Sequence, residues 1–195
     1  MITGKFPELR LRRNRKNEWS RRLVAENNLT ANDFILPLFL IEGKNKKLSI
    51  KSMPNIYRYS LDKIGFIIDK AIKTGLPMIA LFPYTEKKKK NPLGTEALNE
   101  NNLICRALKL IKKKYKNEIG IMCDVALDPY TSHGHDGIIK KNEILNDETL
   151  EILIKQSILQ AKMGCDVIAP SDMMDGRVLK IRKALDKNNL KDVQI

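Results

Sequence analysis

Four short apolar runs divide the chain into repeating units. Each run is nearly continuous rather than alternating between apolar and polar positions, which is the pattern of strands buried on both faces in a parallel sheet. The runs are FILPLFLI (34–41), LPMIALFP (76–83), IGIMCDVAL (119–127) and CDVIAP (165–170). The sequence therefore predicts four parallel strands at these positions.

A segment with helical periodicity follows each predicted strand. Apolar residues recur there at three- and four-residue spacing, which is typical of a helix that packs one face on a sheet. Ser60 is a suitable N-cap for the first helix, and Gly75 and Gly164 suit the ends of the first and third. The expected helices span about residues 61–74, 101–115, 147–163 and 177–188.

The repeating strand–helix units imply a parallel sheet with right-handed crossovers. DVQI, at the end of the sequence, has the character of a fifth strand. Two α/β architectures fit: an open doubly wound sheet, complete at five strands, and a (β/α)8 (TIM) barrel, which needs about 250 residues. Strand centres recur about every 42 to 46 residues, so this chain supplies about half of such a barrel. Because the sequence also stops inside an apparent strand, we expect a fragment, or a truncated product, of a longer barrel.

Composition narrows the class of protein. With 43% hydrophobic and 30% charged residues, the chain suits one globular domain with a core. No apolar run approaches the roughly 20 residues that span a bilayer, and the N-terminus lacks the apolar segment of a secretory signal, so no membrane partner is expected. The three cysteines stand far apart in apolar surroundings, which predicts reduced core thiols in a cytosolic compartment.

The net charge of +13 raises the question of a nucleic-acid partner. Much of the charge falls in RLRRNRKNEWSRR (10–22) and EKKKK (86–90). Lysines are also spread along LKLIKKKYK (108–116) and KIRKALDKNNLK (180–191), however, as on ordinary solvated helix faces. We therefore expect no nucleic-acid partner.

Polar loops follow the second, third and fourth predicted strands. In either architecture, ligands bind beyond the C-terminal ends of the strands. These loops lie within residues 83–97, 124–137 and 170–177. In the last of them, Asp172 and Asp175 precede a predicted helix, so helix capping is expected to account for at least one of them.

The stretch DVALDPYTSHGHDG (124–137) holds three aspartates and both histidines of the chain. Asp124, Asp128 and Asp136 have the oxygen ligands that Mg²⁺ prefers. His133 and His135 suit transition metals or acid–base chemistry, but two histidines in a loop are more often hydrogen-bonded loop residues. Spacing alone leaves both interpretations open.

Five segments together resemble one family. RNRKNEWSRRLVAENNLTANDFILPLFLIEG, MIALFPYT, DVALDPYTSHGHDG, LNDET and APSDMMDGR occur in this order and are similar to porphobilinogen synthase, also called 5-aminolevulinate dehydratase. The resemblance implies a (β/α)8 barrel with an N-terminal arm, here residues 1–30, followed by the first half of the barrel, residues 31–195. It also implies a lyase of tetrapyrrole (haem) biosynthesis that condenses two molecules of 5-aminolevulinate into porphobilinogen.

The resemblance also bears on the metal. Zinc-dependent members of the family carry three cysteines in this stretch, and the matching positions here are Ala126, Asp128 and Asp136. Thiolates favour Zn²⁺, whereas carboxylates favour hard cations. The chain therefore resembles the aspartate-bearing, zinc-independent branch, with Asp128 and Asp136 as candidate Mg²⁺ ligands and no metal role for the histidines.

The amine chemistry of the family has no counterpart in this chain. Two lysines in the second half of the family barrel form Schiff bases with the two substrates. Neither of the sequence motifs that contain these lysines occurs in this chain. Lys155 and Lys162 fall on a predicted exposed helix face, and 87–90 forms a loop. The glutamate associated with allosteric Mg²⁺ would also lie beyond Ile195. We expect residues 1–195 alone to be inactive.

The resemblance places five residues on the active-site side, where they would orient substrate, hold a cation or stabilise charge: Asp124, Asp128, Asp136, Ser171 and Asp172. The implied partners are 5-aminolevulinate and further copies of the chain in a homo-octamer. The expected location is the cytoplasm, or an organellar stroma if an N-terminal transit segment is missing.

Two other functions compete with this interpretation. A different enzyme on a complete five-stranded sheet would need its own nucleophile or phosphate loop, and no GxGxxG or Walker pattern is present. A truncated half-barrel could instead serve as a catalytically inactive binding or assembly module. The resemblance further implies that the basic arm packs on a neighbouring subunit, with Trp19 as a plausible anchor.

Overall fold

A six-stranded sheet forms the centre of the computed structural model, which describes residues 4–195. The strand order is β2-β3-β1-β4-β5-β8, and β6 pairs with β7 in a separate hairpin. The strands are β1 (Ile35–Leu40), β2 (Lys47–Ser49), β3 (Tyr57–Tyr59), β4 (Met78–Pro83), β5 (Gly120–Val125), β6 (Ile138–Lys140), β7 (Glu143–Leu145) and β8 (Val167–Pro170).

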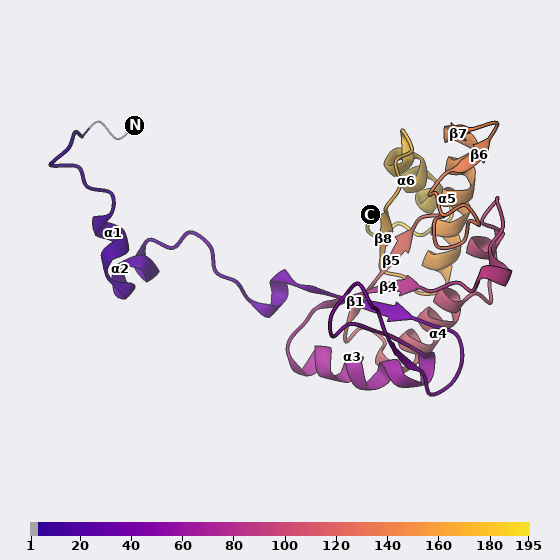
Figure 1. The fold of residues 1–195 in the computed structure, drawn as a ribbon, viewed down its shortest axis with the longest axis horizontal. Coiled ribbons are helices and arrows are strands. Elements are labelled where there is room, and N and C mark those ends of the chain that lie inside the picture. The colour runs from indigo at the N-terminus through magenta and orange to yellow at the C-terminus, as the bar shows by residue number, and fades with distance from the viewer. Residues whose placement is uncertain (1–3) are drawn as a thin grey trace.

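The four strands predicted from the apolar runs are β1, β4, β5 and β8, with slightly shorter ends. They pair in parallel and in sequence order, with Phe39 opposite Phe82, Leu81 opposite Cys123, and Val125 opposite Pro170. A doubly wound sheet reverses its strand order at a switch point, whereas a consecutive order puts every right-handed crossover on one side. Figure 1 shows the helices following one another around these strands. The topology is that of a barrel segment.

Four helices cover the outer side of the sheet, as the periodicity predicts. α4 packs on β4 and α5, and α5 packs on β5, β8 and α6. Asn102 caps α4 by accepting a hydrogen bond from the amide of Cys105 at 2.8 Å. Gly75 and Gly164 follow their helices with φ of +78° and +107°, as expected of C-terminal glycines. The helices are α3 (Ile64–Lys73), α4 (Leu103–Tyr115), α5 (Asn146–Lys162) and α6 (Arg177–Lys187).

Ser60 does not cap the first of these helices with its side chain. It precedes a 3₁₀ turn, Leu61–Lys63, that leads into α3, and no capping hydrogen bond is formed. Its hydroxyl instead accepts from the amide of Lys46 at 2.9 Å. The side chain therefore joins the start of β2 to the end of β3, which the sequence pattern did not predict.

The two faces of the sheet have different surroundings. Ile79, Leu81 and Cys123 point to the helices and are fully buried. On the opposite face, Phe39 and Phe82 stack with centroids 5.5 Å apart, and both are only partly buried. In a closed barrel this second face is the packed interior. The three cysteines are free and buried, which confirms that they are core thiols: Cys105, Cys123 and Cys165.

Two pairs of short strands were not predicted. β3 pairs in parallel with the end of β1 and antiparallel with β2, so it extends the sheet beyond β1. β6 and β7 form a hairpin just before α5. These strands have three residues each and include polar positions, so they carry no apolar run.

The two ends of the described chain differ. Gln194 forms an isolated parallel bridge with Val167 of β8, which is the pairing expected if DVQI begins a fifth strand. The N-terminal segment stretches away from the sheet (Figure 1) and contains α1 (Arg13–Lys16) and α2 (Glu18–Leu23), whose side chains are almost all exposed. Among the described residues no helix is both long and apolar enough to cross a membrane.

Candidate active site at the carboxyl ends of the strands

Asp124 is the next-to-last residue of β5, and its side chain lies on the open face of the sheet. Its neighbours Cys123 and Val125 point to the helices and are fully buried, so strand alternation turns the carboxyl of Asp124 away from the helices. The side-chain amide of Gln160 in α5 donates to the carbonyl of Asp124 at 3.0 Å, and Gln156 donates to the carbonyl of Ala126 at 3.3 Å. Helix α5 therefore fixes the backbone from which the site projects.

The environment of Asp124 favours its neutral form. Burial, and then the nearby carboxylates of Asp128 and Asp172, raise the pKa of Asp124 to about 7. Such a carboxyl group changes protonation near neutral pH, so it can give or take a proton at modest cost. This is the property required of a general acid or base.

The loop after β5 carries Asp128 and Asp136. Burial, and then the charge of Asp136, raise the pKa of Asp128, while its own backbone amide and Lys90 oppose the shift. Lys90 donates to the backbone carbonyl of Asp128 at 3.2 Å. The two carboxylates are therefore close enough to repel each other, and the pair would bind a cation favourably.

Ser171 and Asp172 follow β8, the strand next to β5. The amide of Ser171 donates to the carbonyl of Val125 at 3.1 Å, which joins the ends of the two strands. The carboxyl of Asp172 is buried; it accepts from the amide of Met174 at 2.7 Å and lies 3.4 Å from Nε of Arg177. Burial raises the pKa of Asp172, against the opposing effects of that amide and of Arg177.

The capping role expected at this loop is wrong for both aspartates. The N-cap of α6 is Gly176, in the left-handed region, and no side chain caps it. Asp172 instead closes a local turn onto Met174, and the amide of Asp175 donates to Oδ1 of Asn146 at 2.7 Å.

The two histidines are held by the loop itself. Nδ1 of His133 accepts from the amide of His135 at 3.1 Å, and its Nε2 lies 3.2 Å from the carbonyl of Pro92. Nδ1 of His135 accepts from the amide of Gly137 at 2.9 Å. The same nitrogen also lies 3.0 Å from Oδ1 of Asp136. The geometry favours hydrogen-bonded loop residues over metal ligands.

The donor set suits Mg²⁺ better than Zn²⁺. Catalytic Zn²⁺ sites take three protein ligands, whereas Mg²⁺ keeps several waters and accepts one or two carboxylates. Within residues 4–195, no group of three or more His, Cys, Asp or Glu side chains is placed to hold a metal. Asp128 and Asp136 nevertheless supply a carboxylate pair, and the thiol of Cys123 is buried among the helices.

An amine nucleophile needs a lysine whose pKa is lowered. The shifts seen here have the opposite sign: Glu42 raises the pKa of Lys89, and Tyr115 raises that of Lys114. The site residues described above are carboxyl groups and the hydroxyl of Ser171, and the lysines with a shifted pKa, Lys89 and Lys114, are more basic than usual.

Sequence reasoning missed the residues that support this site. Gln156 and Gln160 are buried on the sheet-facing side of α5, where a packing helix usually has apolar residues. Their spacing, four residues apart among apolar positions, is a signal that could have found them. Lys90 and Arg177 carried no such signal, because their contacts depend on how the loops fold.

Comparisons with known proteins point to one family. The family described as "Delta-aminolevulinic acid dehydratase" matches residues 8–195. The enzyme of that name from Bradyrhizobium diazoefficiens is 56% identical over 96% of this chain and 53% of its own length. The chloroplastic enzyme of that name from Chlamydomonas reinhardtii is 43% identical over 100% of this chain and 50% of its own length.

A solved structure supports the same conclusion. Delta-aminolevulinic acid dehydratase from Toxoplasma gondii ME49, in complex with the reaction product porphobilinogen, superposes with a TM-score of 0.90 and 38% identity, over 94% of this chain and 52% of that chain. The chain thus spans about half the length of these relatives, and its fold is the corresponding part of their barrel. This chain belongs to the delta-aminolevulinic acid dehydratase (porphobilinogen synthase) family.

Proposed function

We propose that this chain is the first half of a porphobilinogen synthase, which condenses two molecules of 5-aminolevulinate into porphobilinogen. The observation that carries the proposal is a gathering of partly buried carboxyl groups at the carboxyl ends of β5 and β8. Besides burial, Asp128 and Asp172 raise the pKa of Asp124, and a further carboxylate, Asp136, raises the pKa of Asp128 and of Asp172. In a barrel of this family the substrates would meet at that end. The Schiff-base lysines would come from the second half of the barrel.

The carboxyl groups have distinct roles in this proposal. Asp124, with its pKa near 7, holds or releases a proton beside the reacting amines. Ser171 and Asp172 orient substrate from the neighbouring strand. Asp172 is suited to this because Met174 and Arg177 hold its carboxyl in place.

Asp128 and Asp136 would hold Mg²⁺ in the aspartate-bearing, zinc-independent branch of the family. A bound divalent cation would supply positive charge that stabilises developing negative charge on substrate oxygen. The support is the chemistry of the donors: two repelling carboxylates and no thiolate beside them. The positive charge of Lys90, which also contacts the carbonyl of Asp128, partly offsets the charge of Asp128.

The proposal also includes a quaternary structure, in which the N-terminal arm contacts a neighbouring copy of the chain. Residues 1–30 are proposed as an arm that packs on a neighbouring copy in a homo-octamer, and residues 31–195 as the first half of the barrel. Trp19 is 62% exposed and Leu23 is 78% exposed, which suits contact surfaces that a partner covers. The proposed location is the cytoplasm, or an organellar stroma.

Two measurements test this proposal. The coding sequence after residue 195 should continue in frame into a motif similar to YSAKYAS. The protein that this longer sequence encodes should form porphobilinogen from 5-aminolevulinate. A stop codon at that point, with no activity, would instead support the half-barrel as a binding or assembly module.

A further inference from the structure

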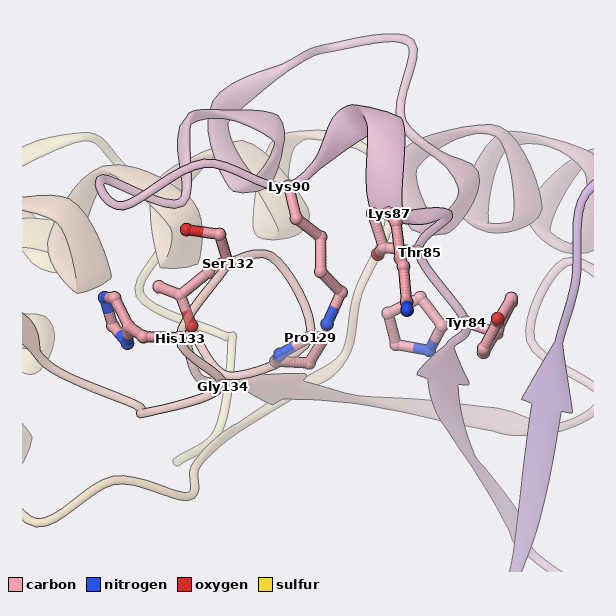
Figure 2. Close-up of a pocket in the computed structure, with 10 residues that line it drawn as sticks. Tyr84, Thr85, Lys87, Lys90, Pro129, Ser132, His133 and Gly134 are labelled. Carbon is pink, nitrogen blue, oxygen red and sulfur yellow. The ribbon is translucent and has the colours of Figure 1, made fainter.

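A pocket of about 550 Å³ lies between the loop that follows β4 and the loop that follows β5. This volume is within the range of small-molecule sites. Figure 2 shows Lys87 and Lys90 reaching into it from one loop, with Pro129, Ser132 and His133 on the other. The lining residues are Pro83, Tyr84, Thr85, Lys87, Lys90, Pro129, Thr131, Ser132, His133 and Gly134.

The four consecutive lysines of the first loop divide into two kinds. Lys88 pairs with Glu86 at 2.9 Å, and Lys89 pairs with Glu42 at 2.9 Å and Glu96 at 3.3 Å. The other two, Lys87 and Lys90, have no carboxylate within 4.0 Å in the part of the chain that the structure describes. Both of them line the pocket.

The local helix type explains this division. Residues Lys87–Lys89 form a 3₁₀ turn that ends at Lys90. A 3₁₀ helix has three residues per turn, so side chains at i and i+3 lie on the same side. Lys87 and Lys90 are three apart and share the pocket side, while the two lysines between them point elsewhere.

Ion pairs and a hydrogen bond hold this turn in place. Glu42, just after β1, accepts from both Lys89 at 2.9 Å and Arg106 of α4 at 2.6 Å. Burial raises the pKa of Glu42, but its hydrogen bonds with Arg106 and Lys89 outweigh that effect and leave the pKa lowered. On the other side, Lys90 reaches the carbonyl of Asp128 at 3.2 Å. The backbone of the turn and the ammonium group of Lys90 are therefore positioned before any ligand arrives.

The rest of the lining suits a compact anionic molecule. No carboxylate is among the lining residues, although Asp128 and Asp136 lie nearby on the same loop. The hydroxyls of Thr85 and Ser132 can donate hydrogen bonds, and Pro83 and Pro129 offer apolar surface. Two like charges without an anion repel each other, and an anion between them removes that cost.

We propose that this pocket is a second binding site, separate from the carboxylate cluster, for a small molecule that bears a carboxylate or a phosphate group. Lys87 and Lys90 bind the anionic group, and the proline-lined wall contacts the body of the molecule. The inference concerns this pocket alone and does not depend on the activity proposed above.

The test uses inorganic phosphate and propionate as probes, titrated into the 195-residue chain at constant ionic strength and followed by calorimetry. Replacing both pocket lysines, Lys87→Gln with Lys90→Gln, should weaken binding at least about tenfold. The matched control Lys88→Gln should stay within about twofold of the parent chain. The tighter-binding probe identifies the preferred group. Binding of neither probe, or an equal loss in the control, would overturn the proposal.

A lysine variant that misfolds would also lose binding, so a second measurement uses the unsubstituted chain. An amine-reactive acetylating reagent is applied with and without the better probe, and each lysine is read by mass spectrometry. The probe should protect Lys87 and Lys90 several-fold and leave Lys88 unprotected. Equal protection of all three lysines would show only general charge screening and would contradict the site.

Discussion

At the residue scale, the pKa of Asp124 is governed mainly by burial. Its carboxyl group lies at the end of a strand beside two other carboxyl groups, and together these effects raise its pKa to about 7. An acid whose folded pKa exceeds its unfolded value of about 3.9 destabilises the fold as it ionises. The penalty grows as pH rises from about 4 to 7 and is constant above that range.

Replacing Asp124 with asparagine should therefore stabilise the fold at pH 8. We expect a gain of the order of 1–4 kcal/mol in the free energy of unfolding, which shrinks toward zero near pH 4. Urea unfolding of the 195-residue chain at several pH values measures it. The exposed Asp192→Asn variant is the control and should show little change. A loss of stability at pH 8 would contradict the assigned environment of Asp124.

Asp166 makes the opposite kind of contribution, at the other end of the same strands. Its carboxylate accepts from the amide of Ile121 at 2.9 Å and pairs with Lys112 at 2.7 Å. Asp166→Ala should lower the free energy of unfolding by about 1–3 kcal/mol, mainly because a partly buried amide loses its partner. Asp186→Ala removes the exposed pair with Arg182 and should cost less than about 1 kcal/mol. Equal effects on urea midpoints would contradict this assignment.

The residues of the site differ in how far sequence could predict them. Asp124 lies near the end of the third apolar run, and Asp128 and Asp172 closely follow the third and fourth runs, so their place at the strand ends followed from the pattern. The supporting contact from Gln160 and the local turn made by Asp172 did not, because they depend on side-chain direction and on the left-handed bend at Gly176. Local sequence specifies those features weakly.

At the element scale, buried strands and amphipathic helices were predictable because burial on both faces leaves an apolar run. β4 and β5 illustrate this, since both lie in the middle of the sheet. β2, β3, β6 and β7 were missed because a three-residue strand at an edge needs no such run. The choice between a barrel and an open sheet needed the observed strand order or the family resemblance.

The arm is the element whose role depends most on a partner. In the isolated chain its apolar side chains are exposed, with Trp19 at 62% and Leu29 at 76%. Deleting residues 1–18 from the protein that carries the whole barrel should lower its oligomeric state in sedimentation, because the arm would no longer reach a neighbouring copy. An unchanged assembly would count against this role. Substituting Phe66, exposed on α3, with alanine is the control and should leave the assembly intact.

At the scale of the whole molecule, the open face of the sheet is the main feature. Ile35 is 44% exposed, and the stacked Phe39 and Phe82 are only partly covered. A barrel interior is normally filled by side chains from all eight strands. The second half of a barrel would cover this face and bring its own groups to the carboxylate cluster.

The metal preference is a property of that whole site. Activity of the protein with the complete barrel should survive a strong zinc chelator, because Ala126, Asp128 and Asp136 offer no thiolate. Porphobilinogen formation, measured with the chelator and with added Mg²⁺ or Zn²⁺, tests this. Complete loss that only Zn²⁺ restores would show that the site belongs to the zinc-dependent branch.

We propose that this chain contributes carboxyl groups, while lysines of the other barrel half perform the amine chemistry. Borohydride reduction in the presence of 5-aminolevulinate fixes each Schiff base as a stable adduct, and peptide mass spectrometry locates it. With the complete barrel, we expect adducts only on lysines beyond residue 195; with residues 1–195 alone, we expect neither an adduct nor porphobilinogen. One specific adduct on a lysine within residues 1–195 would contradict it.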